Sequence, residues 1–265
     1  SILNQKDFTR AKETIKFIKD KKWNSALKSA SKVKDREFRN LINWMYLKTT
    51  RNGASFSEYK NFIEQNSEYP RINRIRFLAE GKIYLRNNSP TSIINWFDKY
   101  PPLGGMGKIK LAEAYLEKGQ TEKVQELIKE GWETATISKN DLGYYRAKFK
   151  KFIDSEDHIR RADYLAWEKK YWDLKRMLKY LPKDQRALYN ARQILMSNSY
   201  GVDNAISKVP EYLKKDPGLE FDRLRWRNRR GRLEGSLEIL YRNSIKTEQQ
   251  MVRPDKWWEQ RESVV

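Results

Sequence analysis

Apolar residues recur three or four positions apart through most of the chain, which is the spacing of one face of an α-helix. The clearest example is a pair of segments joined at Gly119, with Leu111 and Ala114 before the glycine and Val124 and Ile128 after it. No segment alternates apolar and polar residues for long enough to predict a β-strand. The pattern therefore predicts an all-α protein.

Four helical hairpins of this kind can be aligned at their turns, which lie at residues 21–23, 119–121, 170–172 and 231–233. In each hairpin an apolar helix precedes the turn, and small or apolar residues follow it. The spacing between the turns is irregular, unlike a tetratricopeptide array with its repeat of about 34 residues. We therefore expect residues 1–265 to form a single domain, a superhelical α-solenoid of degenerate tetratricopeptide-like hairpins.

The last of these hairpins has a basic first helix. Three arginines, Arg223, Arg227 and Arg230, recur at i, i+4 and i+7, so they lie along one side of the helix. We call these three residues the arginine ridge. Phe221 and Leu224 lie on another side and are expected to face the core.

Two further helices are expected after the turn at Gly231. Leu233, Leu237 and Leu240 have the spacing of a core-facing stripe. Pro254 is suited to the first position of a helix and opens a last short segment, which carries Trp257 and Trp258.

Charge narrows the classes of partner. The chain has 55 Lys and Arg residues against 35 Asp and Glu, a net charge of +20, which favours nucleic acid, anionic lipid or an acidic cell wall as a partner.

The composition also bounds the fold and the kinds of site. Hydrophobic residues make up only 38% of the chain, but aromatic residues reach 13%, and large rings bury much surface, so a packed core is still expected. The absence of cysteine excludes disulfides and thiolate metal sites. No apolar run approaches the roughly 20 residues that span a membrane, and residues 1–4 lack a signal-peptide core.

Several short motifs appear in a consistent order along nearly the whole chain. They are KWNSA at 22–26, GASF at 53–56, WF at 96–97 with PPL at 101–103, LAEA at 111–114, GVD at 201–203, DPGL at 216–219, DR at 222–223 with RW at 225–226, and PDKWW at 254–258. Together they resemble the amino-terminal superhelical, U-shaped domain of soluble lytic murein transglycosylases, most closely the alphaproteobacterial type.

The resemblance implies a function. Members of this family are periplasmic and cleave peptidoglycan between N-acetylmuramic acid and N-acetylglucosamine, leaving a 1,6-anhydro product. Their chemistry resides in a carboxy-terminal lysozyme-like domain with one catalytic Glu, which these 265 residues do not contain. We therefore expect a non-catalytic scaffold that orients its own catalytic domain and presents a basic surface to peptidoglycan in the periplasm.

Two motifs resemble catalytic or phosphate-binding elements without fulfilling their requirements. The Glu-Ser pair at 262–263 mimics the dipeptide around the family's catalytic acid. The Gly-Leu-Met-Gln-type stretch that should follow is missing, and three trailing residues cannot build the cleft that a catalytic Glu needs. The glycine-rich loop at 103–108 fails as a P-loop because Pro102 replaces the first Gly and Ile109 the Ser or Thr. We expect this loop to lead into a helix.

His158 is the only histidine, which excludes a multi-histidine metal site. No serine motif points to a triad that would use it. We expect a structural or solvent-facing role for His158, and we assign no catalytic, cofactor-binding or metal-binding residue.

The remaining candidates are anion- and glycan-binding residues: the arginine ridge (Arg223, Arg227, Arg230), Trp257 and Trp258. The ridge is suited to an anionic polymer, and a tryptophan ring to stacking on sugar. The plainer interpretation is a solvated helix face partly paired with Glu220, Asp222 and Glu234, with one tryptophan buried to dock the terminal helix.

Two other functions fit the same pattern. A basic helical-repeat protein with interleaved Tyr and Trp is also suited to nucleic acid, because bases stack on such rings. A tetratricopeptide-like solenoid is also suited to gripping a peptide of another protein in its groove.

Overall fold

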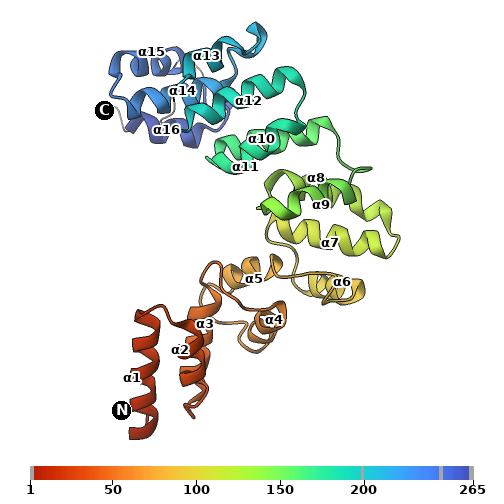
Figure 1. The fold of residues 1–265 in the computed structure, drawn as a ribbon, viewed down its shortest axis with the longest axis vertical. Coiled ribbons are helices and arrows are strands. Elements are labelled where there is room, and N and C mark those ends of the chain that lie inside the picture. Colours follow the sequence, from red (N-terminus) through yellow and green to blue (C-terminus); the bar gives the residue numbers. More distant parts are fainter. Residues whose placement is uncertain (1–2, 198–199, 245–246, 263–265) are drawn as a thin grey trace. The chain divides into compact units, whose positions relative to one another are not determined.

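The computed structural model describes residues 3–197, 200–244 and 247–262. Within those ranges every regular element is a helix and no strand occurs (Figure 1). The prediction of an all-α protein is therefore confirmed. None of the described helices is both long enough and apolar enough to cross a membrane.

The chain divides into two compact units, Ser1–Val124 (unit 1) and Gln125–Val265 (unit 2). The helices of unit 1 are α1 (Gln5–Lys19), α2 (Trp23–Ala30), α3 (Arg36–Leu47), α4 (Phe56–Gln65), α5 (Ile72–Glu80), α6 (Pro90–Lys99) and α7 (Gly105–Glu117). Those that follow are α8 (Val124–Thr134), α9 (Lys139–Lys148), α10 (Ser155–Trp167), α11 (Tyr171–Met177), α12 (Lys183–Leu195), α13 (Val202–Ser207), α14 (Pro217–Arg229), α15 (Leu233–Ser244) and α16 (Pro254–Glu262). That both units belong to one superhelical domain stays a prediction.

All four predicted turns are present, and they share one hydrogen bond. In each turn a backbone N–H donates to the carbonyl five residues earlier, as in the Schellman motif that ends helices. The four bonds are Lys22 to Phe17 (2.8 Å), Gln120 to Tyr115 (3.0 Å), Lys170 to Leu165 (2.8 Å) and Arg232 to Arg227 (3.0 Å). The residue before each donor has a positive φ: Lys21, Gly119, Lys169 and Gly231. The turns are thus structurally equivalent, but the third lies one residue earlier than the alignment at 170–172 predicts, because Lys169 and not Lys170 has the positive φ.

The core of unit 1 is built from aliphatic and aromatic side chains of successive helices, among them Tyr59, Phe62 and Phe97. The helices pack mainly on their neighbours in sequence, α1 on α2, α2 on α3 and α4 on α5, as in arrays of helical hairpins. Each helix contributes at least one fully buried residue to this core, including Ala26, Ile42, Ile63, Ile75, Ile93 and Ile109.

Unit 2 is tied together by a buried arginine. Arg192 of α12 has no exposed surface; its Nε donates to Asp222 of α14 at 2.8 Å, and its Nη1 donates to Asp163 of α10 at 2.6 Å. Burial alone would lower the pKa of Arg192, but the carboxylates of Asp222 and Asp163 outweigh burial and raise it. A single side chain therefore fixes α14, the helix of the arginine ridge, against two others.

Candidate functional site

Helix α14 begins at a cap that its sequence encodes. The Asp216 carboxylate accepts the backbone N–H of Leu219 at 2.8 Å, and Pro217 occupies the first turn. A side chain oxygen at this position satisfies an amide that the helix leaves unpaired. The helix then buries Phe221 and Leu224, as the sequence predicts.

The arginine ridge does not form a row of equivalent exposed cations. Arg227 turns toward α15, where its Nη1 donates to the carbonyl of Gly235 at 2.5 Å and lies 3.6 Å from the Glu238 carboxylate. Arg223 is half-buried, and burial, followed by repulsion from Arg227, lowers its pKa. Arg230 alone is exposed, with its guanidinium 5.3 Å from the ring centre of Trp226. The ridge is mainly a seam between α14 and α15.

The acidic partners of the ridge differ from those expected. Asp222 binds Arg192 and Arg225 instead, and Glu220 lies 3.2 Å from Arg242. Glu238, one turn beyond the predicted Glu234, is the carboxylate that faces Arg227. The packing of α14 against α12 and α15 brings other charged groups closer to Asp222 and Glu220 than the arginine ridge.

The prediction for α15 is wrong at two positions. Leu233 and Leu237 are 55% and 48% exposed, whereas Ile239 is 1% exposed and belongs to the core. Ser236 and Asn243 are buried on the same face as Ile239. The helix is therefore rotated so that a stripe with small and polar residues faces α14, which leaves room for Arg223 and Arg227 between the two helices.

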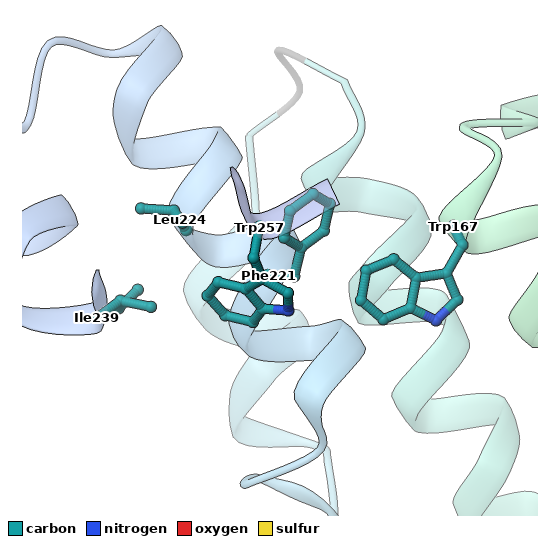
Figure 2. Packing of buried hydrophobic residues seen from close by; sticks show 5 residues of the cluster. All are labelled: Trp167, Phe221, Leu224, Ile239 and Trp257. Carbon is teal, nitrogen blue, oxygen red and sulfur yellow. The ribbon is translucent and has the colours of Figure 1, made fainter. Parts of the chain in front are cut away.

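The two tryptophans of α16 have different roles. Trp257 is 3% exposed, and its ring lies 5.3 Å from that of Phe221, which in turn lies 5.0 Å from Trp167 (Figure 2). These rings join α16 to α14 and α10 through a cluster that also contains Leu224 and Ile239. Trp257 therefore docks the terminal helix, as the plainer interpretation expects for one of the pair.

Trp258 is the exposed member, at 60% of its surface. Its Nε1 donates to the Glu262 carboxylate at 3.0 Å, and the guanidinium of Arg261 lies 5.9 Å from its ring. Glu262 is exposed on α16 and is held by Trp258. More than half of the side chain is exposed, so Trp258 offers an aromatic surface to a planar or sugar ligand.

A second exposed cation–aromatic group surrounds Trp226. The guanidinium groups of Arg230 and Arg232 lie 5.3 Å and 4.9 Å from its ring. Both arginines are exposed, and Trp226 is half-buried. Arg232 follows Gly231 in the turn and was not among the predicted residues, although the basic run RRGR at 229–232 contains it.

His158 has the structural role that the sequence allows. It is 9% exposed, and its Nδ1 accepts a hydrogen bond from Nε1 of Trp132 at 3.2 Å. Burial, followed by repulsion from Arg146, lowers the pKa of His158. The imidazole is therefore neutral near pH 7, and the neutral form can accept the hydrogen bond from Trp132 at Nδ1. No group of three metal-ligating side chains occurs among the described residues.

The glycine-rich loop before α7 binds a carboxylate of the protein itself. Glu80, at the end of α5, is 3% exposed and accepts the backbone N–H groups of Leu103 at 2.5 Å and Gly104 at 3.1 Å. A Cβ atom on Gly107 would lie 2.5 Å from the Glu80 carboxyl carbon. The loop thus leads into α7, as expected, and its anion-binding amides are occupied by Glu80.

Comparison with known proteins gives no further assignment, because no family model, curated protein or solved structure matches the chain.

Proposed function

We propose that this chain is the non-catalytic scaffold domain of a periplasmic lytic transglycosylase, and that it orients a catalytic domain on peptidoglycan. One observation carries the proposal. In unit 2, residues of the family-like motifs interlock the helices.

Three contacts illustrate this. Gly218, in the motif DPGL, lies so close to Arg192 that a Cβ atom would stand 2.3 Å from the guanidinium carbon. Asp222, in the motif DR, binds the same arginine at 2.8 Å. Trp257, in the motif PDKWW, packs on Phe221. A motif made of packing residues is expected of a scaffold, since a scaffold acts through its shape.

The exposed groups around Trp226 and Trp258 are suited to the proposed substrate. Peptide stems carry carboxylates, which arginines bind, and sugar rings stack on exposed aromatic faces. The net charge of +20 adds a long-range attraction that salt weakens, with a screening length of about 8 Å at physiological ionic strength.

The test is co-sedimentation of the 265-residue chain with purified murein sacculi, with duplex DNA binding measured in the same buffers from about 50 to 200 mM salt. A contact through many phosphates loses orders of magnitude in affinity over this range. We expect retention on sacculi without release of soluble 1,6-anhydro sugars. Tight DNA binding without retention on sacculi would instead favour the nucleic-acid function, and binding to neither would remove the support for a wall-directed role.

A pair of variants locates the binding surface. R230Q/R232Q removes the two exposed arginines beside Trp226, and R71Q/R86Q removes two exposed arginines of unit 1. Both variants lose the same net charge. We expect R230Q/R232Q to reduce retention on sacculi several-fold more than R71Q/R86Q. Equal losses would mean that retention reflects only the overall charge.

A further inference from the structure

A polar cleft in unit 1 has features of a binding site that neither the sequence motifs nor the proposed function uses. It has a volume of 270 Å³ and lies where α2, α3 and the end of α4 meet. Its polar lining consists of Ser31, Arg36, Arg39, Asn40, Asn43 and Gln65. Four of these occupy i, i+3, i+4 and i+7 of α3, so that a single helix face supplies most of the lining.

Arg39 is held in place by the backbone. Its Nη1 donates to the carbonyls of Val33 and Lys34 at 2.6 Å and 2.7 Å. Both bonds use the same nitrogen, so the donors on Nε and Nη2 remain for another acceptor. A guanidinium fixed in this way loses little conformational entropy when it binds a ligand.

The other polar groups in the cleft have open hydrogen-bonding capacity. The side chains of Arg36, Asn40, Asn43 and Gln65 make no hydrogen bond or ion pair with the described part of the chain. No carboxylate lines the cleft, so the charge of the two arginines is not neutralised within it. The cleft therefore combines a net positive charge with three free carboxamides.

This combination selects a ligand chemistry. A guanidinium binds a carboxylate through two parallel hydrogen bonds. Each carboxamide both donates and accepts, which matches the N–H and C=O groups of a peptide. A phosphate would use the donors only and would leave the carboxamide oxygens facing an anion. We propose that this cleft binds the free carboxyl end of a short peptide.

The size of the cleft limits the ligand. Its volume is slightly below the roughly 300–1,000 Å³ of typical small-molecule sites, so it accommodates one or two terminal residues. A peptide stem of peptidoglycan and the carboxy terminus of a protein share this chemistry. The inference does not depend on the proposed function, because retention on sacculi and binding in this cleft are measured separately.

The test uses side-chain amide NMR signals of the ¹⁵N-labelled full chain. The probes are N-acetyl-alanyl-alanine with a free carboxylate, the same peptide as its carboxy-terminal amide, and inorganic phosphate at equal ionic strength. We expect the acid to shift the signals of Asn40, Asn43 and Gln65, and the amide to bind at least about tenfold more weakly because the charge-assisted bonds are lost. Equal shifts with acid and amide, or tighter binding of phosphate, would overturn the proposal.

Variants test the named residues. Arg36→Gln is expected to weaken binding of the acid about tenfold without changing the backbone spectrum, because Arg36 is exposed and makes no hydrogen bond or ion pair with the described residues. Arg86→Gln, an exposed arginine outside the cleft, is the matched control and should leave binding unchanged. Unchanged affinity in Arg36→Gln would contradict the assignment. Comparing the D,D and L,L forms of the acid then distinguishes the sources: preference for D,D indicates a murein stem, and preference for L,L indicates a protein terminus.

Discussion

At the residue scale, Arg192 explains the residue types at two positions of the C-terminal motifs, Gly218 and Asp222. Its guanidinium requires Asp163 and Asp222 as partners and Gly218 as a neighbour without a side chain. Breaking a buried ion pair by removing one partner leaves an uncompensated charge in a poorly solvated environment. The motif residues around Arg192 are therefore constrained by one another.

We expect Arg192→Met to lower the free energy of unfolding by about 3–5 kcal/mol, since Asp222 would stay buried without its partner. Urea denaturation followed by circular dichroism measures the loss. The control is Lys214→Met, which removes an exposed pair with Glu211 and should cost less than about 1 kcal/mol. Similar losses in the two variants would show that Arg192 does not hold the three helices together.

The buried His158 should make the free energy of unfolding depend on pH. Its folded-state pKa lies below the unfolded value of about 6.5, so the unfolded state binds more protons as the pH falls from 7 toward 5. Its contribution to stability is complete above that value and is lost as the pH falls through the folded pKa. We expect His158→Asn, which retains an acceptor for Trp132, to show a weaker decline in unfolding free energy between pH 7 and 5. Parallel pH profiles would contradict this role.

At the element scale, the hairpins are held by equivalent turns and by close approaches at a few glycines. The turns could be predicted because Gly119 and Gly231 interrupt clear apolar periods and tolerate a positive φ. The faces of the helices were less predictable. Leu233 and Leu237 fit a core-facing period, yet α15 turns Ile239 inward because the arginines of α14 occupy the space beside it.

Two glycine substitutions in unit 2 should have opposite signs. In Gly218→Ala, the added methyl group would meet the Arg192 guanidinium at 2.3 Å, and we expect a loss of about 1–3 kcal/mol. In Gly143→Ala, within α9, the methyl group meets nothing within 4 Å, and we expect a gain of about 0.5–1 kcal/mol from helix propensity. Thermal unfolding of both variants measures the two changes in stability. An unchanged stability in Gly218→Ala would contradict the close approach of Gly218 to Arg192.

The docking of α16 rests on one of two adjacent tryptophans. We expect Trp257→Ala to lower the free energy of unfolding by about 3–5 kcal/mol, because it opens a cavity beside Phe221. Trp258→Ala, at an exposed position, should change it by no more than about 0.5 kcal/mol. If binding to sacculi uses Trp258, the second variant lowers retention while stability is unchanged. A larger loss of stability in Trp258→Ala than in Trp257→Ala would contradict the placement of α16.

At the scale of the whole molecule, the sequence predicts the all-α fold class and the repeating turns, but not the buried ion pairs of Arg192 with Asp163 and Asp222. The all-α fold follows from local periods, and the burial of Trp257 follows from the preference of large aromatics for packed positions. Arg192 and its carboxylates are 29 and 30 residues apart on separate helices, so no local pattern links them. The ridge was predicted as a surface feature because helix spacing does not reveal that α15 covers Arg227.

We propose, as the central claim, that the net charge of +20, the exposed Trp258 and the cation–aromatic group around Trp226 serve the capture of peptidoglycan. The most direct measurement is the fraction of the chain retained on purified sacculi at about 150 mM salt while duplex DNA competes in solution. The account predicts retention that persists with the competitor and falls in R230Q/R232Q, with no anhydro sugar released. Complete transfer of the chain from sacculi to DNA would contradict it and favour nucleic acid as the partner.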